Sequence, residues 1–222
     1  MLLAAIETSR RSGSVALLVN GELHSRDLAD ARRHACDLVP ALEELRREAG
    51  LPSEPRFDAV AVGVGPGSYT GLRVGIASAL GLARGCGAQM IAIPSAEALV
   101  WCEARSGEEL VVLLDARQRE VYFTHLRREQ AEVRTLVGPS VIAVDELAGR
   151  FPARVPIFAD SAALGELLAP DDAARLRTDA RPHARGIAEL AALRLSRGET
   201  TPLDAVQPLY LRPFGSGKSL PS

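Results

Sequence analysis

The sequence predicts a two-lobed α/β fold that is duplicated around a central cleft. Each half opens with the same order of elements: a strand ending on an acid, a turn, a second strand, a tight turn and a third strand. Alternating strands and helices then complete each half, as in α/β domains. The chain has 222 residues, 47% of them hydrophobic, which is enough to bury one large core or two modest ones.

These patterns divide the chain into two expected lobes and a tail. We expect an N-terminal lobe over residues 1–105 and a C-terminal lobe over 106–214, whose last helix can pack back on the first lobe. The tail, 215–222, is rich in glycine and serine and is expected to be disordered.

The first lobe begins with three strands. Leu2–Ile6, Ser14–Val19 and Glu22–Leu28 are expected to be extended. Asn20 and Gly21 supply the two residues with positive φ that a type I′ hairpin turn requires.

A helix is predicted next, because Leu38, Leu42, Leu45 and Ala49 recur on one helical face. Pro40 should lie near its start, since proline removes a backbone donor. The remaining elements of this lobe are a buried strand at 57–64, a helix at 72–84, a strand at 90–93 and a helix at 95–104.

The second lobe repeats the three-strand opening and then continues with shorter elements. Strands are expected at 110–114, 120–126, 131–137 and 155–159, with turns at 116–119 and 127–130. Helical segments are expected near 144–150, at 162–168 and at 187–195.

The composition favours a protein of the reducing cytosol. Cys36, Cys86 and Cys102 are odd in number and widely spaced, so they predict neither a disulfide framework nor a zinc site. The run Met1–Ile6 meets Glu7 at once and predicts a buried strand rather than a signal peptide, and no apolar run is long enough to span a bilayer. A net charge of −2, with arginines interleaved with acids, provides no overall attraction to nucleic acid.

A glycine-rich turn, residues 65–73, follows a predicted strand and opens a helix. It consists of Gly65, Pro66, Gly67, Ser68, Tyr69, Thr70, Gly71, Leu72 and Arg73. A helix N-terminus presents free N–H groups, so such a turn can hold an anion. The alternative is a tight turn in which the glycines adopt positive φ and Ser68 or Thr70 caps the helix. The spacing matches neither the dinucleotide-binding nor the P-loop pattern, which favours the structural alternative.

The helix that follows this turn has almost no polar face, so it must be covered on more than one side. Gly75, Ala79 and Ala83 recur every four residues and form a flat stripe that another backbone could approach. One side is expected to pack on the sheet. The other is expected to meet either a partner chain or the second lobe of this chain.

Two acids are candidates for a catalytic pair. Glu7 and Asp115 end the first strand of each half and are expected to face the cleft, where paired carboxylates could bind Mg²⁺ or transfer protons. Ordinary turn and capping chemistry is the favoured interpretation, because neither loop has a glycine-threonine pattern for cradling phosphate.

Neither a metal site nor a nucleophile is expected, and no cofactor is predicted. No two histidines are spaced to face one side of a helix. Ser68 does not lie in a Gly-x-Ser-x-Gly elbow. The histidines are His24, His34, His125 and His183.

Several segments together resemble the TsaB (YeaZ) family of bacteria. The resemblance covers essentially the whole chain except its end, and it implies the actin/Hsp70/sugar-kinase fold class, which is ribonuclease H-like. The segments are the glycine-rich turn with the apolar helix behind it, Ile6–Ser9, His34–Pro40, Asp115–Tyr122 and Pro208–Arg212.

The resemblance implies a non-catalytic scaffold or dimerisation subunit. Such a subunit supports a TsaD-type transferase that forms N6-threonylcarbamoyladenosine at position 37 of tRNA, and a TsaE-type ATPase joins the two. It further implies a cytoplasmic protein that reaches tRNA through the complex, pairs with its own copy when the partner is absent, and uses no cofactor.

The family pairs its N-terminal lobes through their first two helices. Carried over to this chain, the partner-binding residues are Leu38, Leu42, Leu45, Leu72, Gly75, Ile76, Ala79, Leu80 and Ala83. We expect Ala79→Arg to abolish partner binding while leaving the fold intact.

Glu7 departs from the Asp that is usual in the family. An added methylene would misplace a carboxylate in a metal or nucleotide site, and a scaffold tolerates this change more easily. Two alternatives remain: an active kinase or ATPase of the same fold that uses Glu7 and Asp115 on Mg·ATP, and a peptidase, for which no nucleophile is visible.

Overall fold

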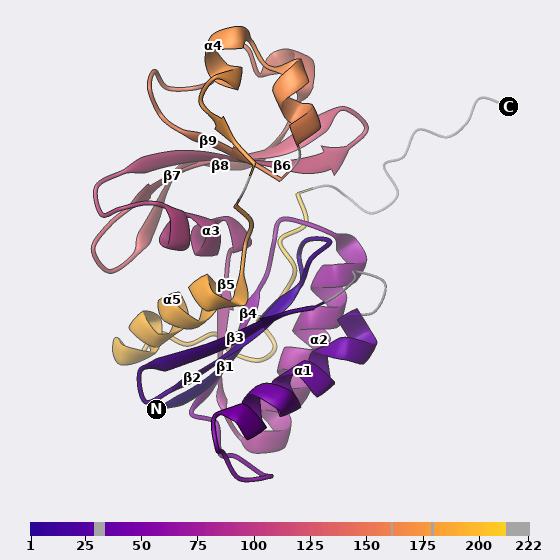
Figure 1. The fold of residues 1–222 in the computed structure, drawn as a ribbon, viewed down its shortest axis with the longest axis vertical. Coiled ribbons are helices and arrows are strands. Elements are labelled where there is room, and N and C mark those ends of the chain that lie inside the picture. The colour runs from indigo at the N-terminus through magenta and orange to yellow at the C-terminus, as the bar shows by residue number, and fades with distance from the viewer. Residues whose placement is uncertain (29–33, 161, 179, 212–222) are drawn as a thin grey trace, which may run out of the picture.

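The computed structural model describes residues 1–28, 34–160, 162–178 and 180–211 and contains two five-stranded mixed sheets (Figure 1). The first sheet comprises β1 (Leu2–Glu7), β2 (Ser14–Val19), β3 (Glu22–Asp27), β4 (Ala59–Gly63) and β5 (Gln89–Ile93). The second comprises β6 (Glu109–Arg117), β7 (Glu120–Arg128), β8 (Val133–Ala143), β9 (Ile157–Ala159) and β10 (Leu176–Arg177).

The two sheets have the same topology. Their orders are β3-β2-β1-β4-β5 and β8-β7-β6-β9-β10. In each, the first three strands pair antiparallel, and the fourth and fifth extend the sheet in parallel from the first strand. The predicted two-lobed, duplicated α/β fold is confirmed.

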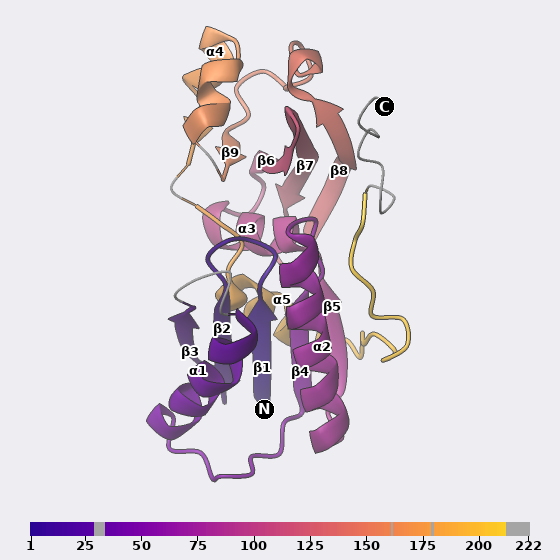
Figure 2. The ribbon, with the colours of Figure 1, turned by 90° about the vertical axis from the view of Figure 1, so that its right-hand side faces the viewer.

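Helices lie between the two sheets and on their outer faces, so that the molecule has five layers (Figures 1 and 2). α1 and α2 cover one face of the first sheet, and α3 and α5 lie between the sheets. Two 3-10 helices cover the far face of the second sheet, and α4, which has no buried residue, follows them in the chain. Their bounds are α1 (His34–Glu48), α2 (Tyr69–Cys86), α3 (Ser95–Glu103), α4 (Pro170–Ala173), α5 (Ala184–Ser196), and 3-10 helices at Val144–Glu146 and Ala162–Leu167.

The hairpin turns show how local sequence decides the strand ends. Asn20 and Gly21 have φ of 51° and 95°, as predicted for the first hairpin. In the second lobe Gln118 and Arg119 take the same positions with φ of 54° and 59°, although neither residue favours that conformation. Strand β6 therefore runs through Asp115 instead of ending there, which corrects the sequence analysis.

The short elements of the second lobe differ most from the prediction. The segment expected to be helical near 144–150 is a 3-10 turn at Val144–Glu146, and that at 162–168 is a 3-10 helix at Ala162–Leu167. β8 extends to Ala143, while α4 and β10 were not predicted because they are too short to show a periodic pattern. The tail 215–222 lies outside the described residues, and the proposed lobe boundaries stay predictions.

The segment after α5 returns along the edge of the first sheet (Figure 2). The Thr201 amide donates to the Met90 carbonyl at 2.7 Å, and the Leu209 amide donates to the Val64 carbonyl at 2.7 Å. Val206 between them is 6% exposed. The segment thus covers edge strand β5 and ends beside the glycine-rich turn.

Within the described part of the chain, no helix has both the length and the apolar character needed to cross a membrane.

Candidate functional site

The glycine-rich turn is built as a helix cap. Ser68 is the N-cap of α2, and its Oγ accepts a hydrogen bond from the Gly71 amide at 3.3 Å. Gly65 has a φ of 101°, a conformation that side chains rarely adopt. The predicted cap is confirmed, whereas positive φ is confirmed at Gly65 and not at Gly67 or Gly71.

The other glycines of the turn are explained by close packing on the residues after β1. A Cβ on Gly67 would lie 2.3 Å from the Ser9 carbonyl oxygen, and one on Gly71 would lie 2.1 Å from the Thr8 carbonyl oxygen. The Ser68 amide donates to the Ser9 carbonyl at 2.7 Å. Because the donors of Ser68 and Gly71 are used within the chain, the geometry argues against a phosphate-binding loop.

Two tyrosines and an arginine fasten the C-terminal segment to the start of α2. The rings of Tyr69 and Tyr210 stack with their centroids 5.1 Å apart. The Arg73 guanidinium lies 4.3 Å from the Tyr69 ring centroid, and its Nε donates to the Tyr210 hydroxyl at 3.1 Å. The three residues therefore stabilise one another.

The two candidate acids occupy different environments. Glu7 is 1% exposed, and its Oε1 accepts from the Ser9 amide at 2.6 Å. Burial raises the pKa of Glu7, and the nearby Ser9 and Ser95 hydroxyls offset this only in part. Asp115 is exposed, and its amide donates to Asp160 Oδ1 at 2.9 Å. The expectation that both acids face an open cleft is therefore wrong for Glu7, which faces the core.

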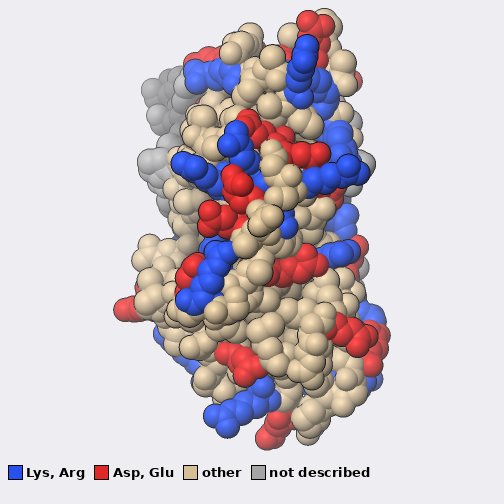
Figure 3. Space-filling view, turned by 90° about the vertical axis from the view of Figure 1, so that its left-hand side faces the viewer, with Lys and Arg blue, Asp and Glu red and all other residues tan. Residues whose placement is uncertain are grey.

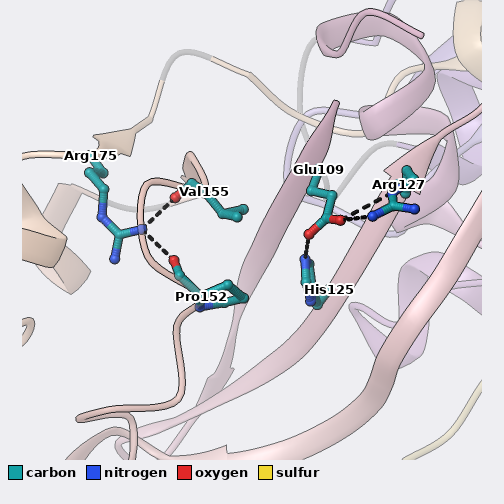
Figure 4. A network of polar contacts seen from close by, with 6 residues as sticks. All are labelled: Glu109, His125, Arg127, Pro152, Val155 and Arg175. Atoms are coloured by element: carbon teal, nitrogen blue, oxygen red, sulfur yellow. Dashed lines mark hydrogen bonds and ion pairs between the residues drawn. The ribbon is translucent and has the colours of Figure 1, made fainter. Parts of the chain in front are cut away.

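Two of the four histidines, His125 and His183, have structural partners. His125 Nε2 lies 2.8 Å from Glu109 Oε2, and Arg127 pairs with the other oxygen of Glu109 (Figure 4). His183 Nδ1 accepts from the Arg185 amide at 3.0 Å. Among the described residues, no group of three His, Cys, Asp or Glu side chains is arranged to hold a metal ion.

Figure 4 also shows an arginine that holds a loop of the second lobe. Arg175 Nη1 donates to the carbonyls of Pro152 and Val155 at 2.8 and 2.7 Å. The contact is a structural one, since it satisfies two loop carbonyls at once.

The stripe of small residues on α2 faces inward. Ala79 and Ala83 are 0% and 1% exposed, and a Cβ on Gly75 would lie 2.2 Å from Thr8 Oγ1. This stripe lets α2 pack closely on the first sheet, against β4 and β1, and it is not an exposed surface. The expectation that Ala79→Arg leaves the fold intact is wrong, because the substitution would place an unpaired charge in the core.

Four other residues of the predicted partner-binding set are also covered by the chain itself. They are 1%, 2%, 0% and 6% exposed, for Leu38, Leu45, Leu72 and Ile76 in that order. Leu80 is half-buried, and Leu38 and Leu42 are the members of the set that line the outer groove described next.

An open groove of about 810 Å³ runs between α1 and α2 on the outside of the first lobe. Its floor is apolar, and Val39 on its α1 side is 64% exposed. The lining residues are Leu38, Val39, Leu42, Glu43, Arg46, Ser53, Glu54, Pro55, Arg56, Phe57, Ser78, Gly81, Leu82, Gly85 and Cys86.

The α2 wall of this groove contains two glycines that the chain itself does not require. A Cβ on Gly81 or Gly85 would meet no atom within 4 Å, and neither residue has positive φ. Each glycine within a helix costs about 1 kcal/mol relative to alanine. The sequence analysis missed both residues, although their four-residue spacing was visible beside the buried stripe.

Charged side chains border the groove, and two of them, Glu43 and Arg46, form an ion pair. Arg46 donates from Nε and Nη2 to the Glu43 carboxylate at 2.7 and 2.6 Å. An apolar floor with a charged rim is the usual composition of a protein-binding surface. On the face of the molecule in Figure 3, charges of both signs are interspersed, as the sequence analysis expected.

Comparison with known proteins shows which family the chain resembles. A family model described as "TsaD: tRNA N6-adenosine threonylcarbamoyltransferase" matches residues 28–169. The chain is 40% identical over 133 residues to the tRNA threonylcarbamoyladenosine biosynthesis protein TsaB of Haemophilus influenzae, an alignment that spans 59% of this chain and 56% of that protein. It is 27% identical to the TsaB protein of Escherichia coli over 100% of this chain and 99% of that one.

Solved structures agree with these relatives. YeaZ from Pseudomonas aeruginosa superposes with a TM-score of 0.82 at 30% identity, covering 95% of this chain and 99% of that chain. A second Pseudomonas aeruginosa structure, described as an uncharacterized protein with similarity to peptidase YEAZ, has a TM-score of 0.83 at 30% identity. The chain belongs to the TsaB (YeaZ) family.

Proposed function

We propose that this chain is a non-catalytic scaffold subunit in the biosynthesis of threonylcarbamoyladenosine on tRNA. In this role it supports a TsaD-type threonylcarbamoyltransferase that modifies position 37. The observation that carries the proposal is the apolar groove between α1 and α2, which is open in the isolated chain. The TsaB names of its relatives, together with the TsaD family match, supply the pathway.

The two exposed glycines support a helix as the occupant of the groove. Gly81 and Gly85 weaken α2 without relieving any contact inside the chain. Small side chains at this spacing let a second helix bring its backbone close to α2. The stability that α2 loses is then offset only when a partner's helix packs there, beside the exposed Val39.

The non-catalytic part of the proposal is supported by the candidate acids and the turn. Glu7 is buried, and the Ser68 donor of the turn is occupied by the Ser9 carbonyl. A kinase or ATPase would need such groups to be free for Mg·ATP. Binding of ATP and Mg²⁺ by the isolated chain in calorimetry, at micromolar concentrations, would support the enzyme alternative instead.

The remaining assembly follows the same proposal. A TsaE-type ATPase joins the two subunits, tRNA is contacted through the complex, and the protein works in the cytoplasm. A groove left open by the absence of its partner can also pair with a second copy of this chain. Light scattering over a concentration series, with and without the TsaD-type partner, separates homodimer from heterodimer.

The test is a substitution that fills the groove while remaining exposed. Gly81→Leu should abolish co-elution with the TsaD-type partner and leave the melting temperature unchanged or raised, because leucine is a better helix former than glycine. Arg185→Leu is the matched control, since it also adds an exposed leucine. Its site is on α5, which packs on the face of the first sheet opposite to α1, α2 and the groove. Co-elution of the folded Gly81→Leu variant with the partner would refute the assignment of the groove.

Cys86 offers an independent footprint, because its side chain lines the groove. In a chain that retains Cys86 alone, the partner should slow alkylation of this thiol. Alkylation at an unchanged rate in the complex would place the partner elsewhere.

A further inference from the structure

One ion pair joins the loop after β1 to the end of β9 in the other lobe. Arg10 pairs with Asp160, and the two side chains are only 17% and 9% exposed. A pocket of about 250 Å³ lies beside the pair. The contact therefore links the lobes at the place where a cleft was expected.

Asp160 is fixed to the second lobe on its own side of the contact. Its Oδ1 accepts from the Asp115 amide at 2.9 Å, and its amide is 3.4 Å from the Leu113 carbonyl oxygen. Both of these partners belong to β6, the central strand of the second sheet. The carboxylate thus has a rigid base.

Arg10 follows directly on the residues that hold the glycine-rich turn. The Ser9 carbonyl accepts from the Ser68 amide, and Thr8 Oγ1 donates to the Gly71 carbonyl at 2.8 Å. This contact is so close that it leaves no room for a side chain at position 67 or 71, where the chain has glycines. A shift of the loop after β1 would therefore move the start of α2.

We propose that Arg10 and Asp160 form an interlobe clamp that fixes the loop after β1 and, through it, the glycine-rich turn. The second lobe then has a definite task in a protein whose proposed partner surface lies entirely on the first lobe. Removing either charge weakens a contact between two side chains that are both nearly buried, which is costly. This inference concerns the isolated chain and does not depend on the proposed partner.

The test is amide hydrogen exchange in the full chain carrying Asp160→Asn, which keeps an oxygen acceptor for the Asp115 amide. Exchange at the Ser68 and Leu72 amides should accelerate about tenfold or more, because the loop that holds the turn opens more often. Asp145→Asn is the matched control: it removes the same charge from an ion pair with Arg119 that is largely exposed, and it should leave these rates unchanged.

A charge-swapped variant separates the clamp from general destabilisation. Arg10→Asp combined with Asp160→Arg should restore slow exchange in the turn at least in part, whereas Arg10→Asp alone should not. Exchange rates in the turn that stay at the wild-type level in both folded single variants would overturn the proposal. So would equal acceleration in the single and swapped variants.

Discussion

At the end of β1, the longer acid of this chain is accommodated by a glycine on the neighbouring strand. A Cβ on Gly63 would lie 2.0 Å from Glu7 Oε2, which is far inside van der Waals contact. The pair lies in a buried region, since Glu7, Thr8 and Ser9 are all at most 1% exposed. Glu7 and Gly63 are therefore expected to depend on each other.

A double-mutant cycle tests this dependence. Gly63→Ala should destabilise the fold by about 1–3 kcal/mol, because the added methyl group overpacks the core. Introducing Glu7→Asp into that variant should recover part of the loss, although Glu7→Asp alone should be destabilising through the cavity it leaves. Urea unfolding of the four proteins measures the coupling energy, and strictly additive effects would contradict it.

A second buried acid gives the stability a pH dependence. Glu97 on α3 is 8% exposed, and burial raises its pKa from 4.5 to about 7 despite the Arg194 guanidinium 2.6 Å away. Because the pKa is higher in the folded state, protonation of Glu97 adds to the free energy of unfolding. This contribution is complete below pH 4.5 and is lost as the pH rises through about 7.

Glu97→Gln should therefore flatten the fall in unfolding free energy between pH 5 and pH 8, a slope that one proton limits to about 1.4 kcal/mol per pH unit. The exposed Glu146 provides the control, and Glu146→Gln should leave the slope unchanged. Urea titrations at several pH values measure it. Equal slopes for wild type and Glu97→Gln would contradict the prediction.

At the scale of the element, α2 has two rows of small residues with opposite tasks. The inner row, Gly75, Ala79 and Ala83, is buried and lets the helix lie against the first sheet. The outer pair, Gly81 and Gly85, lines the groove, and a Cβ on either would meet no atom within 4 Å. The same residue type thus stabilises the fold on one face and weakens the helix on the other.

Gly85→Ala should reveal this division by two effects of opposite sign. The isolated chain should gain about 0.5–1 kcal/mol, because alanine is the better helix former. Association with the TsaD-type partner should weaken, because the methyl group holds the partner's helix away. Thermal unfolding and a binding titration measure the two effects. A variant that is more stable and binds equally well would show that the outer glycines are not a contact surface.

Sequence periodicity predicted the existence of α2 but could not assign its faces. The helix is apolar nearly all round, so no hydrophobic stripe marks its inner side, and the inner glycine row looks the same as an interface row. Only the contact of Gly75 with Thr8 distinguishes them. The pairing of β2 with β3 was predictable because the Asn20-Gly21 turn fixes its register, whereas Gln118 and Arg119 provide no such signal for β6 and β7.

At the scale of the whole molecule, the two lobes share a core. One hydrophobic cluster contains Ala5 and Ile91 from the first sheet, Leu99 and Ile187 from the helices between the sheets, and Val112 from the second sheet. Figure 2 shows α3 and α5 lying between the two sheets. Since separation of the lobes would expose this cluster, we expect them to unfold together.

Trp101 makes this expectation measurable. It is the one tryptophan of the chain, it lies on α3, and its Nε1 donates to Glu189 on α5 at 2.7 Å. Its fluorescence therefore reports on the central layer, while far-UV circular dichroism reports on both lobes. The two signals should follow one unfolding curve in the wild type.

Leu99→Ala should lower the midpoints of both signals equally, since it removes a side chain that is 1% exposed from the shared cluster, at a cost of about 2–5 kcal/mol. Val39→Ala, at an exposed position in the groove, should leave both midpoints in place. Two separate transitions in circular dichroism, with fluorescence following only one of them, would mean that the lobes are independent. An interlobe clamp would then act between separate domains rather than within one cooperative unit.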